Sequence, residues 1–149
     1  MGNLCSRTIP KNLNPRDVPK FIPPVKKGRV IKVYDGDTIT VAAYLPMRKS
    51  KLYKFSVRLA RIDCPELKTQ NKAEKEVAII ARDFVSNLIL NSMVTLKDVK
   101  TEKYGRLLAD VIYCDQSISD LLLKERLAVL YDGGTKNVPK NWKKFYMNN

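Results

Sequence analysis

Apolar and polar residues alternate over three segments in the first part of the chain, as is typical of β-strands. Residues 30–33 predict a first strand, which ends at the turn-forming dipeptide Asp35-Gly36. The β-branched and apolar segment 38–45 predicts a second strand. Residues 53–62 alternate most clearly and predict a third strand that is buried on one face.

The next part of the chain combines one helical pattern with two strand patterns. Apolar residues recur at steps of three and four over residues 77–88, which predicts an amphipathic helix that ends near Asn91. Strands are predicted at 93–96 and at 107–113, with a turn over 101–106 between them.

Two further helices are predicted near the C-terminus. The first covers residues 118–127, with either Ser117 or Ser119 as its N-cap. The second covers residues 139–146, where Pro139 suits the first helical turn.

This order of elements predicts an α+β fold, namely a five-stranded OB-type β-barrel with an inserted helix and C-terminal helices. Small barrels of this type bind oligonucleotides on one face. Many other α+β folds share the same order, so the order alone does not select the OB-fold.

Residues 1–27 differ from the rest of the chain because they contain several prolines and little apolar periodicity. We interpret them as a flexible N-terminal arm, with the folded domain covering residues 28–149. The arm is basic, since Asp17 is its only acidic residue. Its basic residues are Arg7, Lys11, Arg16, Lys20, Lys26 and Lys27.

Charge and composition restrict the binding partners and the catalytic groups that the protein can use. The 149 residues include 28 Lys and Arg against 15 Asp and Glu, a net charge of +13, which favours binding to nucleic acid or to an anionic membrane. The absence of histidine excludes His-activated nucleophiles, a His general base and His-ligated zinc. Hydrolysis would therefore depend on carboxylates, an oxygen-bound cation, and Arg or Lys.

The three cysteines, Cys5, Cys64 and Cys114, are odd in number and show no CxxC spacing. This usage predicts a reducing compartment rather than a disulfide framework. The sequence shows no apolar run of transmembrane length and no signal-peptide pattern, so we expect an intracellular protein.

Three short polar segments carry the candidate chemistry, and each has an ordinary explanation when taken alone. The first is an aspartate-rich turn, the second places carboxylates at a strand end, and the third is a basic turn. The segments are Asp35-Gly36-Asp37-Thr38, Arg58 to Glu66 with Asp63-Cys64-Pro65-Glu66 at its end, and Lys103-Tyr104-Gly105-Arg106.

Taken together and in this order, the three segments resemble the staphylococcal nuclease family over about residues 28–130. The resemblance implies one Ca²⁺ per active site, with Asp37 and Asp63 as ligands and the main-chain carbonyl of Cys64 as a further ligand. Asp35 would be an outer-shell carboxylate. Carboxylate and carbonyl oxygens suit a hard cation whose remaining positions are filled by water.

The same resemblance implies the catalytic groups. Glu66 matches the carboxylate that activates or orients the attacking water, and Arg58 and Arg106 match two arginines that grip the phosphate. Guanidinium groups form paired hydrogen bonds with phosphate oxygens that lysine cannot reproduce. The alternative for Arg58 is a surface ion pair, because strand alternation turns it away from its apolar neighbours. Arg61, which has no family counterpart, is expected to be solvated or paired.

Lys103 and Tyr104 would flank the scissile phosphate, since tyrosine stacks on bases without regard to sequence. Tyr131 is as compatible with ordinary packing as with stacking, and Trp142 could be a core anchor or a stacking surface. We interpret the side chain of Cys64 as structural, and we expect Cys114 to be a small hydrophobic residue at a strand end.

Two departures from the family pattern concern the helices. Arg126 stands where a glycine ends the second helix of the type member, which puts the turn geometry in question. The stretch after Glu66 is shorter and more helical in pattern than the mobile loop of that member, so substrate access is expected to differ.

The first six residues, Met-Gly-Asn-Leu-Cys-Ser, fit the pattern for N-myristoylation at Gly2, with Cys5 placed for palmitoylation. Two acyl chains, or one chain and the basic arm, would hold the protein stably on the cytoplasmic face of a membrane. The alternative is a chance match in a disordered tail. Some plant nucleases of this family are similar at this end.

These observations lead to one main hypothesis and two alternatives. The main hypothesis is a monomeric, Ca²⁺-dependent nuclease that hydrolyses DNA and RNA, preferably single-stranded or frayed, with little sequence specificity and leaves 3′-phosphate ends. The first alternative is a non-catalytic OB-fold module that only binds nucleic acid. The second is a basic membrane adaptor, which would leave the three segments unexplained.

Overall fold

A computed structural model describes residues 7–148, so the predicted acylation sites Gly2 and Cys5 lie outside the described residues. Five strands form a closed mixed barrel, which confirms the predicted α+β OB-type fold. They are β1 (Lys27–Val33), β2 (Thr38–Tyr44), β3 (Leu52–Leu59), β5 (Met93–Thr101) and β6 (Leu107–Tyr113).

The barrel closes through one parallel pair of strands. All other neighbours, β3–β2–β1–β5–β6, are antiparallel, whereas β3 and β6 run parallel with Val57 opposite Leu107 and Leu59 opposite Ala109. These four side chains are buried and belong to the central core. Closure also brings the end of β3 beside the turn that precedes β6, although these segments are far apart in the sequence.

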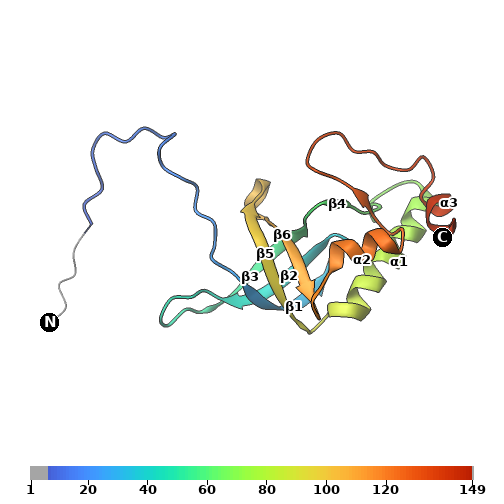
Figure 1. Cartoon of the computed structure of the whole chain (residues 1–149), viewed down its shortest axis with the longest axis horizontal. Helices are drawn as coiled ribbons and strands as arrows, with labels where there is room; N and C mark the ends of the chain where they lie inside the picture. The colour runs from blue at the N-terminus through green and yellow to red at the C-terminus, as the bar shows by residue number, and fades with distance from the viewer. Residues whose placement is uncertain (1–6, 149) are drawn as a thin grey trace.

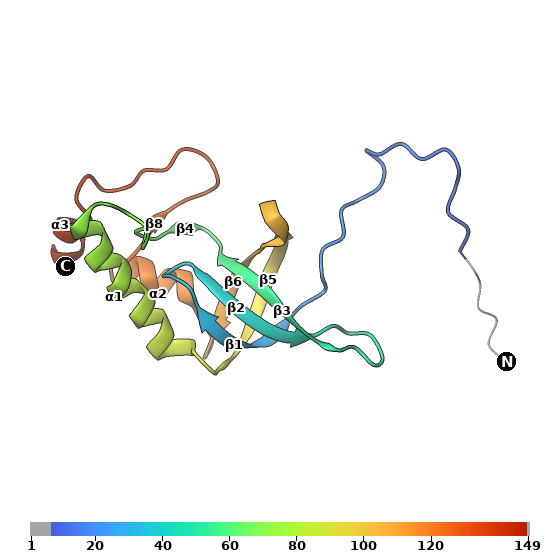
Figure 2. The ribbon, with the colours of Figure 1, turned by 180° about the vertical axis from the view of Figure 1, so that it is seen from behind.

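The helices gather at one end of the barrel, away from the N-terminal segment (Figures 1 and 2). Helix α1 (Lys72–Ile89) buries Val77, Ala81 and Val85 against the barrel, in the predicted three- and four-residue rhythm. Its N-cap residue is Asn71, whose side chain accepts a hydrogen bond from the main-chain N–H of Glu74 at 3.2 Å. Helices α2 (Ile118–Lys124) and α3 (Trp142–Met147) complete this layer.

Four short elements connect the barrel to its loops. Strand β4 (Ile62–Asp63) pairs with β8 (Val129–Leu130), and β7 (Gln116–Ser117) pairs antiparallel with the end of β6. The 3₁₀ turn η1 (Lys103–Gly105) lies between β5 and β6. Because β4 pairs with β8, the loop that follows α2 is held against the segment that follows β3.

Helix α2 begins at Ile118 as predicted, whereas α3 begins later than predicted. Helix α3 begins after Asn141, whose side chain caps it, so the prediction that Pro139 lies in its first turn is wrong. Ser117 occupies the N-cap position of α2, but its hydroxyl donates to Asp110 instead of capping. Ser119 lies inside α2 and donates to the main-chain oxygen of Ala60.

Trp142 is a core anchor, which decides between the two alternatives left open by the sequence. It is 4% exposed and packs edge-on against Phe145 with ring centroids 5.8 Å apart. The prediction for Cys114 is wrong, because this residue is exposed in the turn after β6 with φ of 48°. The polar residues after Cys114 favour a turn, and this preference places Cys114 in the turn instead of in the apolar strand before it.

Arg126 adopts the left-handed conformation that glycine usually provides at the end of a helix, with φ of 54°. Its Nε atom donates to the main-chain oxygen of Phe145 at 2.6 Å, and its guanidinium lies 4.2 Å from the ring centroid of that residue. Contacts with α3 therefore offset the strain of a non-glycine residue at this position.

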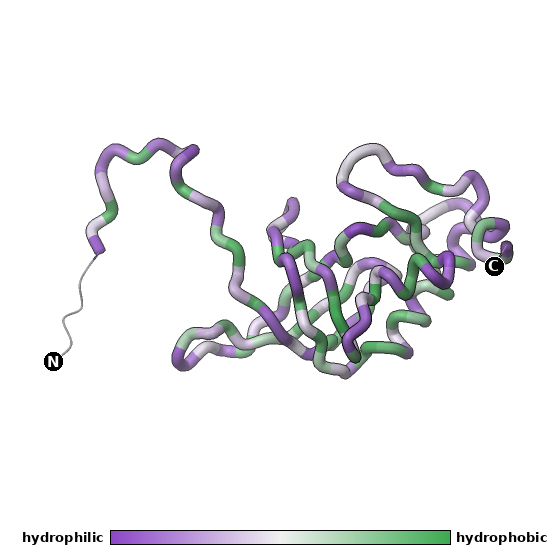
Figure 3. Tube along the Cα trace, in the orientation of Figure 1, coloured by the Kyte–Doolittle hydropathy of each residue, from purple (hydrophilic) through white to green (hydrophobic). Residues whose placement is uncertain are grey.

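The folded part begins before Gly28. Val25 is 2% exposed within the core, and the main-chain N–H of Leu96 donates to the oxygen of Lys26 at 2.8 Å. Residues 7–24 form neither helix nor strand and extend from the barrel (Figure 1), with hydrophilic positions interrupting hydrophobic ones throughout (Figure 3). None of the helices in residues 7–148 has the length and apolar character needed to cross a bilayer.

Candidate active site

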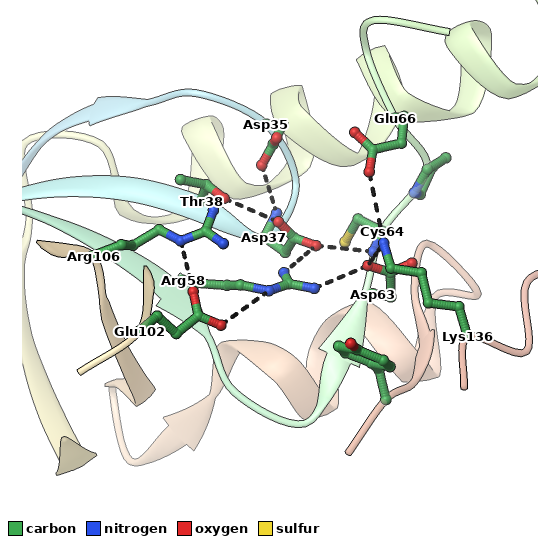
Figure 4. A pocket seen from close by; sticks show the side chains of 12 residues that line it. Asp35, Asp37, Thr38, Arg58, Asp63, Cys64, Glu66, Glu102, Arg106 and Lys136 are labelled. Atoms are coloured by element: carbon green, nitrogen blue, oxygen red, sulfur yellow. Dashed lines mark hydrogen bonds and ion pairs between the residues drawn. The ribbon is translucent and has the colours of Figure 1, made fainter. Parts of the chain in front are cut away.

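A cavity of about 250 Å³ lies at the end of the barrel where the three motif segments meet (Figure 4). Most residues that the sequence singled out line it: Asp35, Asp37, Arg58, Asp63, Cys64, Glu66, Arg106 and Tyr131. Four others line it that the sequence reasoning missed as site residues: Thr38, Pro65, Glu102 and Lys136.

Gly36 allows the β1–β2 turn to enter this site. A Cβ atom at Gly36 would lie 2.9 Å from both the Ala81 Cβ and the Cys64 Sγ, so any side chain would push the turn away from α1. The close approach fixes Asp35 and Asp37 on either side of Gly36. The Asp35 Oδ1 atom accepts a hydrogen bond from the Asp37 main-chain N–H at 3.1 Å.

Arg58 is the centre of the site and is only 7% exposed, so the alternative of a surface ion pair is wrong. Its Nη1 atom lies 2.8 Å from Asp37 Oδ2, and its Nη2 atom lies 2.9 Å from Asp63 Oδ1. Nη2 also donates to the main-chain oxygen of Ile62 at 3.2 Å. The buried charge is thus paired on two sides and hydrogen-bonded, as a buried ion must be.

The pKa of Arg58 depends on two opposing effects, burial and the nearby negative charges. Burial lowers the pKa of the guanidinium, but the negative charges of Asp37 and Asp63 outweigh burial and raise the pKa above its ordinary value. Arg58 therefore carries a permanent positive charge at the bottom of the cavity, fixed in place by two carboxylates.

The two aspartates of the β1–β2 turn face the same space. Asp37 is 7% exposed, and its Oδ2 atom accepts from the main-chain N–H of Cys64 at 3.1 Å as well as from Arg58. Burial, together with the charge of Asp37, raises the pKa of Asp35 from 3.8 to about 6. A cation bound near this pair would be stabilised by the same negative charge.

Asp63 and Glu66 share a positive partner, Lys136, from the loop after β8. The Lys136 Nζ atom lies 3.0 Å from Asp63 Oδ1 and 3.8 Å from Glu66 Oε1. Asp63 is 3% exposed, whereas the Glu66 side chain is 61% exposed and lies at the mouth of the cavity. The Glu66 main-chain N–H donates to Glu74 Oε1 at 3.0 Å, which ties this segment to the first turn of α1.

The donor set has the chemistry of a hard-cation site, because Asp37, Asp63 and the carbonyl of Cys64 offer only oxygen. Within residues 7–148, however, no three His, Cys, Asp or Glu side chains are grouped closely enough to hold a metal ion. Two carboxylates and one carbonyl are compatible with Ca²⁺ when water supplies the remaining ligands. The metal role of these residues stays a prediction.

Glu102 links the two arginines predicted to grip phosphate. Its Oε2 atom lies 2.7 Å from Arg106 Nε, and its Oε1 atom lies 3.9 Å from Arg58 Nε. Both guanidinium groups therefore lie beside one carboxylate at the edge of the cavity (Figure 4). Its position directly before the Lys103–Arg106 turn was the signal that could have identified it in the sequence.

Lys103 and Tyr104 lie outside this cavity but line an adjoining groove of about 1080 Å³. The groove shares Arg58, Arg106 and Tyr131 with the cavity, so the two spaces are continuous. Tyr104 is fully exposed, and Tyr131 lies with its ring centroid 5.7 Å from the Arg58 guanidinium carbon.

Two residues follow their structural interpretations. The Cys64 thiol is buried, and burial together with the charges of Asp37 and Asp35 raises its pKa well above the ordinary value, which disfavours the thiolate that a nucleophile requires. Arg61 is paired, as expected, with Asp120 at 2.9 Å and Asp110 at 3.5 Å. Arg61 therefore fixes β6 and α2 instead of facing the cavity.

Residues 56–147 match the family described as Staphylococcal nuclease homologue. Among curated proteins, the chain is 31% identical to a probable endonuclease of Schizosaccharomyces pombe over 85% of this chain and 65% of the relative. It is 33% identical to Endonuclease YncB of Bacillus subtilis over 72% of this chain and 50% of the relative. An uncharacterized endonuclease of Haemophilus influenzae is 35% identical over 69% of this chain and 51% of the relative.

The chain thus spans between half and 65% of the length of these relatives. The family match covers well over half of the chain and includes the end of β3, the loop that follows it, and the Lys103–Arg106 turn. On this evidence the chain belongs to the staphylococcal nuclease homologue family.

Proposed function

We propose that the protein is a metal-dependent endonuclease that hydrolyses phosphodiester bonds of DNA and RNA with little sequence specificity. The observation that carries this proposal is the convergence of two guanidinium groups, Arg58 and Arg106, with the carboxylates of Asp37, Asp63 and Glu66 around one cavity. The names of the relatives, which describe endonucleases, support the same activity.

The charges of the cavity suit an anionic substrate whose charge grows during reaction. Arg58 is held by Asp37 and Asp63, and Arg106 by Glu102, so each guanidinium keeps N–H groups for phosphate oxygens. Paired hydrogen bonds from these groups would strengthen as negative charge accumulates on the phosphate, which is selective stabilisation of the transition state.

Glu66 is the carboxylate best placed to orient water, because its side chain is exposed at the cavity mouth. In the proposed reaction the water oxygen attacks phosphorus, the bond from phosphorus to the 5′-oxygen breaks, and one water proton passes to Glu66. The departing 5′-oxygen takes up a proton from solvent water. The products are a 3′-phosphate end and a 5′-hydroxyl end. The protein has no histidine that could perform this step instead.

One Ca²⁺ would be held by Asp37, Asp63 and the Cys64 carbonyl, with Asp35 as a nearby carboxylate. When bound, the ion would neutralise charge on the phosphate and on the surrounding carboxylates. Lys136, which contacts both Asp63 and Glu66, would compete with it for the same charges.

Single-stranded or frayed nucleic acid is the proposed substrate, bound by a monomer. The exposed ring of Tyr104 and the half-buried ring of Tyr131 offer stacking surfaces that accept any base, with Lys103 beside them. The net charge of +13 makes binding strongly salt-dependent.

We also propose, from the sequence pattern, that acylation at Gly2 and Cys5 brings this intracellular nuclease to the cytoplasmic face of a membrane. The exposed lysine and arginines of residues 7–16 would add attraction to anionic lipids. Fatty-acid labelling of the wild type and of Gly2→Ala in eukaryotic cells tests this proposal, and equal labelling of both would refute it.

A digestion assay on plasmid DNA and on RNA, with Ca²⁺, Mg²⁺ or EDTA, tests the nuclease proposal. We expect cleavage with Ca²⁺ that is lost in Glu66→Gln and in Arg106→Ala, and that is retained in the matched surface variants Glu76→Gln and Arg82→Ala. Glu76 and Arg82 lie on α1 and pair with Lys143 and Asp83, away from the cavity. Tight binding without cleavage under any metal would instead support a non-catalytic OB-fold binding module.

A further inference from the structure

The segment just before the barrel forms part of the groove beside the active site. Lys20 and Phe21 line this groove together with four residues that also line the catalytic cavity: Arg58, Glu102, Arg106 and Tyr131. A substrate strand lying in the groove would therefore pass from the cavity to the N-terminal segment without leaving the protein surface.

The position of Phe21 is restricted by its short connection to the core. Val25 is 2% exposed within the core, and the next residue, Lys26, accepts a main-chain hydrogen bond from Leu96 on β5 at 2.8 Å. Between Phe21 and this anchor lie Pro23 and Pro24, whose rings fix φ. Lys20 and Phe21 therefore stay close to β5 and η1, whose residues line the same groove. Less chain entropy is lost when they bind a ligand than for a segment without such an anchor.

Two aromatic rings in this groove are exposed to solvent. Phe21 is 73% exposed, and Tyr104 is fully exposed at a residue with φ of 61° in η1. Single exposed apolar residues are common on protein surfaces, but two unpacked rings that line the same basic groove are typical of a stacking site.

The charge of the groove matches a phosphate backbone. Lys20, Lys100 and Lys103 line it and are exposed, and none of the three is in an ion pair with an acidic side chain of residues 7–148. Two acidic residues line the groove: Glu102, which is already paired with Arg106, and Asp132, which leaves the groove lysines in excess. The groove therefore presents uncompensated positive charge beside its two rings, which suits an anion that also carries flat bases.

We propose that Lys20 and Phe21 form a subsite for single-stranded DNA or RNA, in which Lys20 contacts a backbone phosphate and Phe21 stacks on a base away from the scissile phosphate. This inference rests on the proposed nuclease function and extends the substrate site beyond the cavity into the N-terminal segment. An anionic membrane is the competing partner for the exposed Lys-Phe-Ile sequence. Membrane binding, however, would not require Lys20 and Phe21 to line the same groove as Arg58 and Arg106.

The test compares Lys20→Ala/Phe21→Ala with the matched control Ile9→Ala/Lys11→Ala. The control removes an exposed apolar residue and an exposed lysine from the same segment but outside the groove. The activity of both variants is measured on a single-stranded oligonucleotide of about 30 nucleotides and on a dinucleotide. We expect the groove variant to raise the KM for the long substrate by about 5- to 50-fold, with unchanged kcat and an unchanged KM for the dinucleotide.

Binding of a fluorescent oligonucleotide in EDTA, measured by anisotropy, separates this inference from the nuclease proposal. A weaker affinity of the groove variant supports the subsite even if no metal supports cleavage, whereas an affinity equal to that of the control overturns it while leaving the nuclease intact. Phe21→Tyr is expected to retain wild-type affinity because its ring still stacks. A groove variant that keeps its oligonucleotide affinity but no longer floats with phosphatidylserine vesicles would assign the segment to a membrane and overturn the subsite.

Discussion

The ammonium group of Lys136 lies 3.0 Å from the carboxylate of Asp63, although the two residues are 73 positions apart in the chain. The pairing of β4 with β8 makes this contact possible, because it holds the start of the Lys136 loop against the segment that carries Asp63. A lysine that neutralises a predicted metal ligand affects how strongly the site attracts a cation.

Lys136→Met removes this internal competitor while keeping the length of the side chain. We expect Ca²⁺ to bind about 3- to 10-fold more tightly to the variant, since a partly exposed ion pair contributes only modestly. Isothermal titration or terbium luminescence measures the change. Lys140→Met, on the same loop and exposed, is the control and should leave the affinity as it is. Unchanged or weaker Ca²⁺ binding by Lys136→Met would show that the lysine does not oppose the ion.

Glu102→Gln tests whether the carboxylate between the two arginines positions them. Gln can still accept one hydrogen bond from Arg106, but it loses the ion pair and the attraction for Arg58. We expect kcat to fall about 10-fold, while affinity for an oligonucleotide is equal or higher because negative charge has left the groove. Steady-state kinetics with anisotropy binding resolves the two effects.

A merely structural role for Glu102 would give a different pattern. Loss of folding would lower binding and kcat together and would reduce the melting temperature. Glu76→Gln, which also removes a carboxylate from an ion pair, serves as the control because Glu76 faces Lys143 away from the site. A Glu102→Gln enzyme with wild-type kcat would refute the positioning role.

Most of the barrel could be predicted from the sequence because burial on one face of a strand enforces a period of two. The three motif segments could be located because their residues are close in the sequence and their spacing is distinctive. Ends of elements were harder: Asn141 begins α3 through a side-chain cap, and the preceding Pro139 gave a competing signal. Cys114 illustrates a related error, since an apolar residue at the end of a strand fell into the following turn.

The rest of the site depends on tertiary contacts that leave no periodic trace. Lys136 reaches Asp63 only because β4 pairs with β8, and Glu102 meets Arg58 only because β3 closes onto β6. Charged loop residues are common on surfaces, so nothing local distinguishes Lys136 from Lys140. Arg58 shows the same limit, since strand alternation turned it away from the core face whereas barrel closure buried it.

Gly36→Ala tests the close approach that fixes the β1–β2 turn. The added Cβ would meet Ala81 and Cys64 at 2.9 Å, a separation that requires the turn or α1 to move. We expect a loss of about 1–3 kcal/mol in the free energy of unfolding, measured with urea, and a fall in nuclease activity as Asp37 shifts. Gly134→Ala, in an exposed loop, is the control and should change stability by less than about 0.5 kcal/mol. Wild-type stability of Gly36→Ala would mean that the turn is not tightly packed.

Asp35→Asn tests the electrostatic strain of the β1–β2 turn in the metal-free protein. The folded state raises the pKa of this carboxyl from 3.8 to about 6, because burial and Asp37 disfavour its charged form. Both states are protonated below the lower pKa, so the carboxyl then has no effect on stability. As pH rises between the two values the unfolded state ionises first, and the wild type loses stability until the folded pKa has been passed.

Asn keeps an oxygen that can accept from the Asp37 N–H but never ionises, so the variant avoids this loss. In EDTA we expect Asp35→Asn to be more stable than the wild type by about 1–2 kcal/mol at about pH 8, allowing for solvent screening, and equal to it at about pH 3.5. Saturating Ca²⁺ should reduce the difference at the higher pH, because a nearby cation stabilises the ionised carboxylate. Urea denaturation across this pH range gives the answer, with Asp132→Asn in an exposed loop as control; a stability difference independent of pH would refute the electrostatic origin.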